Sequence, residues 1–138
     1  MLAEMILCMA LNGYHEARGE TTAGELAVNN VVMNRVNDPR YKDDVCGVVK
    51  AGRYRDGNPI RHACAFSWWC DGKSDSITDT DAWTHSNHLA NYVIRGIYPD
   101  ITDGATHYHK IGYYPKWIND VGMVRVGLIG DHIFYRWE

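Results

Sequence analysis

The stretch NGYHEARGE, residues 12–20, decides the fold because a helix must end in it before another begins. Gly19 favours that break, and it stands between two acidic residues, Glu16 and Glu20. A carboxyl group half-buried at the end of an apolar helix loses hydration, so we expect the pKa of Glu16 to be raised. Such an acid protonates a leaving oxygen near neutral pH. These nine residues alone nevertheless favour an exposed Glu16 paired with Arg18.

The segments on either side of this stretch favour helices. Residues 2–14 are apolar almost all round, which predicts a buried helix that loosens at its end. The following segment, TTAGELAVNNVVMNRVN (residues 21–37), is the clearest helix, with Thr22 and Glu25 as a capping box. It should end before Pro39, because the residue that precedes a proline is disfavoured in a helix.

The remainder mixes helical, looped and extended segments. We expect a short helix from about residue 45 to near Gly52, capped by Asp43 or Asp44, and a longer helix over 78–95, capped by Thr78 or Asp79. Residues 53–76 favour a loop or an irregular hairpin with turn chemistry at Asp71-Gly72. The pieces MVRV and HIFYR near the end favour strands. The prediction is an α+β fold, mainly helical with a small β region, in a single domain over 1–138.

The composition is that of an ordinary globular protein. The 138 residues are 46% hydrophobic and 22% charged, enough for one core. The net charge of −3 gives no basic field for nucleic acid or an anionic membrane. The N-terminal run MLAEMILCMAL lacks a basic region and carries Glu4, so we predict a core helix and no signal peptide. The five Trp and nine Tyr suit stacking on sugar rings or an aromatic core.

The cysteines and histidines do not form a recognisable metal motif. The four cysteine spacings match no zinc pattern, and His107 and His109 lack a third ligand at a fixed spacing. Cys8 falls in an apolar run, and Cys64 and Cys70 would pair only if the chain turns back between them. Without a visible secretion signal, we predict reduced thiols.

Several blocks of the sequence resemble the SleB-type cell wall hydrolases, which include spore-cortex lytic enzymes and related phage lysins. The first block, NGYHEARGETTAGELAVNNVVMNRV, resembles the family's opening signature, except for the additional Tyr14-His15. AFSWWCDGKSD resembles a second family segment, with Ala65 where a glutamine is common. DGATHYHKIGYYPKWI and IGDHIFYR resemble the closing pattern. The blocks occur in the family's order and span nearly the whole chain.

This resemblance implies a lysozyme-like fold and cleavage of the β-1,4 bond from N-acetylmuramic acid to N-acetylglucosamine in peptidoglycan. It places the catalytic acid on Glu16 and implies a lytic transglycosylase, which leaves 1,6-anhydro ends and needs no metal or other cofactor. Glu20 is the second catalytic candidate, expected to orient the turn or shape the local field. The cleft residues we expect to bind the glycan are Phe66, Ser67, Trp68, Tyr108, His109 and Trp117.

Other readings of the sequence stay open. A hydrolytic muramidase would use the same acid with water as nucleophile, and a non-catalytic module would only bind glycan. A zinc amidase or peptidase would depend on the histidines. We expect a monomer that acts on peptidoglycan glycan strands, with no nucleic acid or membrane partner. As a phage lysin it would wait in the host cytoplasm before release to the wall, or be carried in the virion.

Overall fold

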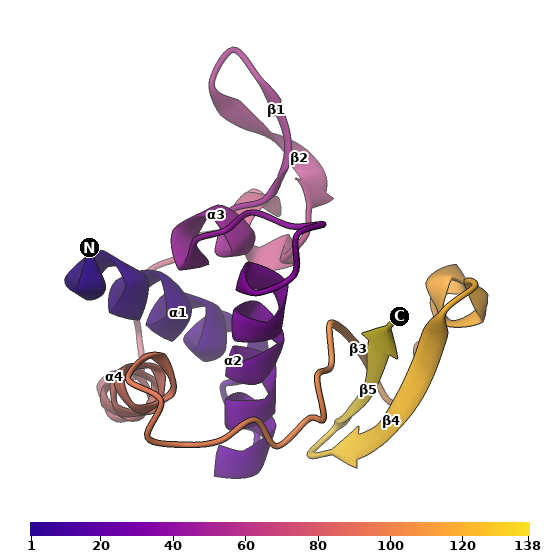
Figure 1. Ribbon diagram of the computed structural model, residues 1–138. Helices are drawn as coiled ribbons and strands as arrows, with labels where there is room; N and C mark the ends of the chain where they lie inside the picture. Colours follow the sequence, from indigo (N-terminus) through magenta and orange to yellow (C-terminus); the bar gives the residue numbers. More distant parts are fainter.

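Four α-helices and two small β-sheets make up the protein, and a computed structural model describes all of residues 1–138 (Figure 1). The predicted α+β class with a small β region is confirmed. The helices are α1 (Leu2–Ala17), α2 (Thr22–Val36), α3 (Val45–Val49) and α4 (Thr80–Ile94). The strands are β1 (Gly52–Arg55), β2 (Asn58–Cys64), β3 (His107–Lys110), β4 (Met123–Ile129) and β5 (His132–Trp137). Two short 3-10 helices are η1 (Ser67–Cys70) and η2 (Lys116–Asn119).

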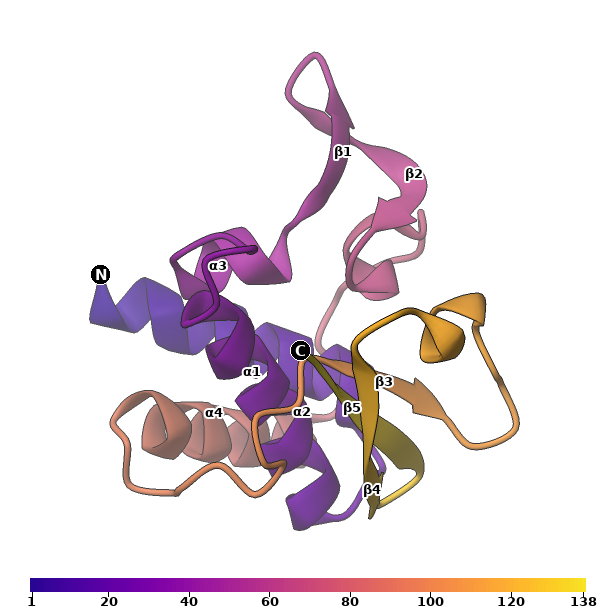
Figure 2. The ribbon, with the colours of Figure 1, turned by 45° about the vertical axis from the view of Figure 1, so that its right-hand side comes forward.

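Helix α2 lies in the middle of the molecule, between the other helices and the sheet formed by β3, β5 and β4 (Figures 1 and 2). Val32 packs with Met9 in a hydrophobic core shared with α1, α3 and α4. Val28 packs with Phe134 in a second core against the sheet. Burial on both sides explains why α2 is apolar over more than one face. No helix has the length and apolar character needed to cross a membrane.

Helix α1 extends further than the sequence predicts. It continues to Ala17, so Glu16 lies in its last turn rather than after its end. Gly13 does not loosen the helix, because it faces α2 at close range. A Cβ atom at Gly13 would lie 2.9 Å from Oε2 of Glu25. The break comes at Gly19, whose φ of +91° suits glycine.

The N-terminal cap of α2 differs from the predicted capping box. Thr21, not Thr22, is the cap, and its hydroxyl group accepts a hydrogen bond from the N–H of Gly24 at 3.1 Å. Glu25 turns into the protein and is buried, with Oε2 lacking a hydrogen-bond partner. The other two predicted caps are confirmed, since α3 begins after Asp44 and α4 after Asp79.

The hairpin lies earlier in the chain than its predicted turn. β1 and β2 pair antiparallel through Asp56-Gly57, both with positive φ, which is the favoured geometry of a two-residue hairpin turn. Asp71-Gly72 instead makes a turn after η1, where the N–H of Lys73 donates to Oδ1 of Asp71 at 2.9 Å. The hairpin projects away from the helices, as Figure 2 shows.

The second sheet has the strand order β3-β5-β4, with antiparallel neighbours throughout. Its outer strands include the predicted HYH segment and MVRV, and its central strand includes HIFYR. His107 pairs with Tyr135 and Lys110 with His132 in the β3–β5 register. This sheet brings residues near the C-terminus against α2, and so beside the end of α1.

The prediction of reduced thiols is wrong. Cys8 of α1 is joined to Cys46 of α3, with their Cα atoms 5.3 Å apart. Cys64 at the end of β2 is joined to Cys70 of η1, with Cα atoms 6.1 Å apart. The first pair depends on α3 packing across α1, a tertiary contact that cysteine spacing does not reveal.

Candidate active site

Glu16 is half-buried in the last turn of α1, where the helices meet the second sheet. The hydroxyl group of Tyr108, on β3, donates a hydrogen bond to Oε1 of Glu16 at 2.5 Å. The strand places this phenol opposite the helix end, and the bond leaves Oε2 available to a ligand. The prediction that Tyr108 lies near Glu16 is confirmed.

Burial is the main influence on the pKa of Glu16. Desolvation raises this pKa, and the opposing effects of the Tyr108 hydrogen bond and of the charges of Lys110 and Arg35 are smaller. The carboxyl group therefore keeps its proton to a higher pH than an exposed glutamate. Burial, followed by the charge of Glu16, also raises the pKa of Tyr108 well above its usual value. Tyr108 is therefore a hydrogen-bond donor throughout the neutral range.

A pocket of about 130 Å³ opens beside Glu16. Glu16 is its only acidic residue, and Arg35 brings a positive charge to the same wall. The other residues around it come from three later parts of the chain: Ala65, Phe66, His107, Tyr108 and Trp117. The pocket thus combines one carboxyl group of raised pKa with a phenol, a guanidinium group and aromatic walls.

Arg35 is a site residue that the sequence analysis did not single out. Its Nε donates to the backbone oxygen of Thr106 at 2.8 Å, which ties α2 to the start of β3. Its guanidinium group also lies over the rings of Tyr41 and Phe66, 5.0 and 5.4 Å from their centroids. The sequence signal for Arg35 is its place in NRV, the tripeptide that ends the first family-like block.

The predicted glycan-binding residues divide into two groups. Phe66, Tyr108 and Trp117 line the pocket, whereas Ser67, Trp68 and His109 do not. Ser67 is exposed, while Trp68 turns inward because η1 is helical, not extended. His107, rather than His109, faces the pocket.

Trp68 and His109 have structural partners instead. The indole N–H of Trp68 donates to Oδ1 of Asn12 at 2.8 Å, which joins η1 to α1. His109 is buried, with Nε2 3.0 Å from the hydroxyl oxygen of Tyr135. Both side chains therefore support the walls of the pocket from behind.

Glu20 lies outside the pocket and binds the turn between β4 and β5. Its Oε1 accepts a hydrogen bond from the N–H of Asp131 at 2.9 Å and lies 3.0 Å from Nδ1 of His132. Burial raises the pKa of Glu20, but the hydrogen bonds to Asp131 and the interactions with His132 outweigh it and lower the pKa. The His132 ring meets Tyr108 edge-on, with centroids 5.0 Å apart. Glu20 is therefore connected to the site only indirectly: it contacts His132, and His132 packs against Tyr108.

The chain does not offer a ready metal centre. No three His, Cys, Asp or Glu side chains lie close enough together to hold a metal ion. His107 packs against Trp117, with ring centroids 5.0 Å apart, and desolvation lowers its pKa to about 4. Its imidazole is neutral at physiological pH and belongs to the aromatic wall.

This pocket and fold belong to a known class of enzymes. The model of the Cell Wall Hydrolase family matches residues 19–135, and the chain therefore belongs to this family of wall-degrading enzymes. The predicted resemblance is confirmed. The match begins at Gly19, three residues after Glu16.

Individual relatives agree with this assignment. The chain is 48% identical over 44 residues to a spore cortex-lytic enzyme of Halalkalibacterium halodurans, a stretch covering 32% of this chain and 13% of that protein. It matches the crystal structure of the catalytic domain of the Bacillus cereus SleB protein with a TM-score of 0.67 and 28% identity, over 96% of this chain and 89% of that one.

A second solved structure is equally similar. The catalytic domain of the germination-specific lytic transglycosylase SleB from Bacillus anthracis matches with a TM-score of 0.68 and 28% identity. The match covers 96% of this chain and 93% of that one, so α1 and the sheet are both included. The predicted lysozyme-like fold is confirmed by these two matches.

Proposed function

We propose that the protein cleaves the bond between N-acetylmuramic acid and N-acetylglucosamine in peptidoglycan as a lytic transglycosylase, with Glu16 as the catalytic acid and base. The observation that carries this proposal is the position of Glu16 as the only carboxyl group in a pocket that holds a phenol, a guanidinium group and aromatic rings. The name of the Bacillus anthracis relative, a lytic transglycosylase, supports it.

The chemistry needs two proton transfers, one from Glu16 and one back to it. Protonated Glu16 donates its proton to the glycosidic oxygen as the bond to the muramic anomeric carbon breaks, and N-acetylglucosamine leaves. The Glu16 carboxylate then removes the proton from the 6-hydroxyl group of the same muramic residue. That oxygen attacks the anomeric carbon and closes the 1,6-anhydro ring, and Glu16 is again protonated.

The surroundings of Glu16 support both halves of this cycle. Burial favours the protonated acid before cleavage, while the charges of Arg35 and Lys110 and the hydrogen bond from Tyr108 stabilise the carboxylate afterwards. The pKa is thus held between these opposing influences, as an acid that alternates between roles requires.

The single acid also favours an internal nucleophile over water. Glycosidases that use water or a covalent intermediate generally employ two carboxyl groups at a set separation. Glu20 is occupied by Asp131 and His132, and no second carboxyl group lines the pocket. A hydroxyl group carried by the sugar itself gains an effective concentration that free water lacks.

The products of digestion test this proposal directly. Purified sacculi digested without reduction are expected to give 1,6-anhydromuramic ends, each lighter by one water than a reducing end. Mass spectrometry of the released muropeptides distinguishes the two. Dominant full-mass reducing ends would identify a hydrolytic muramidase, and cut peptide stems with intact glycan would exclude a glycosidase altogether.

Removal of the Tyr108 hydroxyl group should change both rate and pH dependence. Tyr108→Phe is expected to lower kcat roughly tenfold, the value of a hydrogen bond to a charged group. Activity requires protonated Glu16 and is lost as pH rises through its pKa. The Tyr108 hydrogen bond lowers that pKa. The variant should therefore keep activity to higher pH, and the alkaline limb of its pH–rate profile should shift to higher pH.

A matched substitution separates this effect from packing. Tyr135→Phe removes the hydroxyl group that bonds to His109, away from the pocket. It should leave the alkaline limb of the pH profile in place. An unchanged limb in Tyr108→Phe would mean that its phenol does not act on Glu16.

The disulfides bear on where the protein works. Disulfides persist in oxidising environments and are rare in a reducing cytoplasm. All four cysteines are paired, so we propose that the active form works on the wall side of the cytoplasmic membrane. Mass spectrometry of alkylated protein recovered from the wall should find four unlabelled cysteines.

A further inference from the structure

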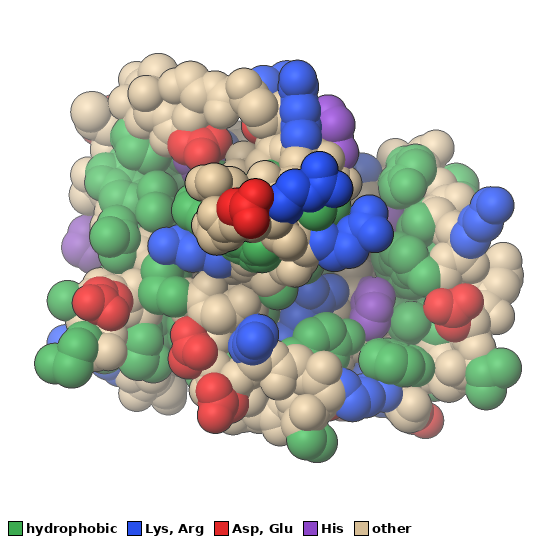
Figure 3. Space-filling model, turned by 90° about the horizontal axis from the view of Figure 1, so that it is seen from above, with side chains coloured by type: hydrophobic (Ala, Val, Ile, Leu, Met, Phe, Trp, Pro, Cys, Tyr) green, Lys and Arg blue, Asp and Glu red, His purple; other side chains and the backbone are tan.

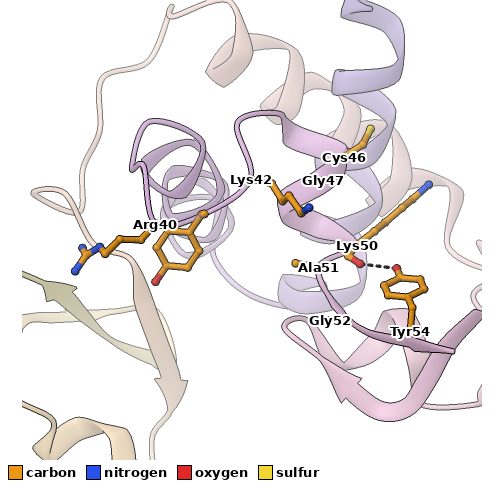
Figure 4. Close-up of a pocket in the computed structure, with 9 residues that line it drawn as sticks. Arg40, Lys42, Cys46, Gly47, Lys50, Ala51, Gly52 and Tyr54 are labelled. Carbon is orange, nitrogen blue, oxygen red and sulfur yellow. Dashed lines mark hydrogen bonds between the residues drawn. The ribbon is translucent and has the colours of Figure 1, made fainter. Parts of the chain in front are cut away.

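The largest hollow of the surface is separate from the Glu16 pocket and has no part in the proposed reaction. It lies between the loop after α2, helix α3 and the start of β1, and has a volume of about 790 Å³. Figure 4 shows the residues around it, among them Arg40, Lys42, Lys50, Ala51 and Tyr54. A hollow of this size exceeds what a single small ion would fill.

This hollow, which we call the α3 pocket, shares a wall with the catalytic pocket. The N–H of Ala65, a residue of the catalytic pocket, donates to the backbone oxygen of Ala51 in the α3 pocket at 2.9 Å. Arg35 of the catalytic pocket lies over the ring of Tyr41, which lines the α3 pocket. A substrate held at Glu16 therefore has the α3 pocket one layer of residues away.

One positive charge in the α3 pocket is unpaired. Arg40 is bound by Asp38 at 2.7 Å and by the backbone oxygen of Trp137, and its guanidinium group points away from the hollow (Figure 4). The amino group of Lys50 lies 4.9 Å from the ring centroid of Trp69. Lys42 has no carboxylate partner, and its amino group is directed toward the middle of the hollow.

The backbone favours this placement of Lys42. A Cβ atom at Gly47 of α3 would lie 2.8 Å from Oδ2 of Asp44, the helix cap, and 3.0 Å from Cβ of Lys42, so glycine leaves room for both side chains against the helix. The neighbouring hydroxyl group of Tyr41 has no hydrogen-bond partner within the protein. The α3 pocket thus offers a cation and a hydroxyl group that the protein itself does not use.

The charges around the α3 pocket also favour an anionic ligand. The residues that line the α3 pocket include Arg40, Lys42 and Lys50 and no acidic residue. The protein as a whole has a net charge of −3. Figure 3 looks down on the hairpin side of the molecule, where Lys and Arg side chains gather beside some Asp and Glu side chains. This face therefore attracts an anion although the whole molecule does not.

From these observations, and resting on the proposed function, we propose that the α3 pocket binds a carboxylate of the peptide stem carried by the muramic acid residue, with Lys42 as its ion-pair partner. A stem peptide extends away from the sugar, and the Ala51–Ala65 contact is the wall that it would pass. The carboxylate of an unsubstituted lactyl group lies on the sugar itself and would remain on the Glu16 side.

Two soluble substrates test this proposal: glycan oligomers with their stem peptides, and the same oligomers after an amidase has removed the stems. Lys42→Gln should raise KM on the stem-bearing oligomers about tenfold, with kcat retained, and Lys42→Glu should raise it further. Neither variant should alter KM on the stripped oligomers, which carry free lactyl carboxylates. High salt should reduce the difference in KM between wild type and the Lys42 variants on stem-bearing oligomers, because Lys42 is exposed and its charge is screened.

A charge-matched control is Arg95→Gln, at the end of α4, which removes a cation that bonds to Asn91. It should leave both KM values unchanged. An unchanged KM of Lys42→Gln on stem-bearing oligomers would overturn the proposal. An equal increase on both substrates would do so too, because the lactyl carboxylate would then be the ligand.

Direct binding keeps this test independent of the reaction. Free stem peptide, titrated into the protein by calorimetry, should bind wild type and Arg95→Gln but bind Lys42→Glu at least about tenfold more weakly. If wild type cleaves neither substrate, the proposed function has failed, and this titration alone decides the role of the α3 pocket. Equal affinity in all three proteins would refute that role.

Discussion

Replacement of Glu16 with Gln is expected to lower the rate of glycan cleavage by roughly 10²-fold or more, with the fold retained. The amide keeps the shape of the side chain and still accepts the hydrogen bond from Tyr108. It has no acidic proton to give to the leaving oxygen and cannot take one from the 6-hydroxyl group. The loss should therefore appear in kcat, with KM for glycan oligomers little changed.

Two other glutamates provide controls for this substitution. Glu4→Gln, at an exposed position of the same helix, should have no effect on rate or stability. Glu20→Gln should lower the melting temperature, because Glu20 bonds to Asp131 and His132, and should affect kcat less than Glu16→Gln does. Wild-type activity to within a few-fold in Glu16→Gln would show that the acid has been misassigned.

Loss of the Cys8–Cys46 disulfide is expected to have the largest effect on stability. The bridge closes a sequence separation of 38 residues, for which loop-closure entropy predicts about 4 kcal/mol of stabilisation. The double substitution Cys8→Ala/Cys46→Ala should therefore lower the melting temperature by on the order of 10 °C or more. Thermal unfolding followed by circular dichroism, with and without a reducing agent, measures this change.

The second disulfide should behave differently. It spans a separation of 6 residues, worth about 2 kcal/mol by the same reasoning. Between its cysteines lie Ala65 and Phe66, which line the catalytic pocket. Cys64→Ala/Cys70→Ala should therefore cost less stability but more activity than loss of the first bridge. If Cys64→Ala/Cys70→Ala lost less activity than Cys8→Ala/Cys46→Ala, the η1 segment would hold its shape without the bridge.

Local sequence signals predicted most of the secondary structure but not its exact ends. Asp44 and Asp79 cap helices as expected, since a cap depends on residues a few positions away. The end of α1 could not be predicted because it depends on packing against α2 at Gly13. Tyr14, in the dipeptide that departs from the family pattern, is fully buried and accepts bonds from the N–H groups of Thr78 and Asp79.

The candidate site, too, could be predicted only in part from nearby residues. Its acid followed from the first family-like block, but its partners depend on contacts between distant segments. Tyr108 is 92 positions from Glu16 in the sequence, and Arg35 reaches the site through Thr106. The position of Trp68 could not be predicted either, because it depends on the packing of η1 against α1 through Asn12.

The scattered origin of the catalytic pocket has a consequence for a chain that is still being synthesised. The pocket takes residues from α1, α2, the segment before η1, β3 and η2, and β3 pairs only with β5, which follows β4 in the chain. A ribosome-bound chain that ends before β5 has Glu16 but no strand to hold Tyr108 against it. The candidate site is therefore assembled only after translation has passed β5, and a chain truncated before β5 is expected to lack lytic activity.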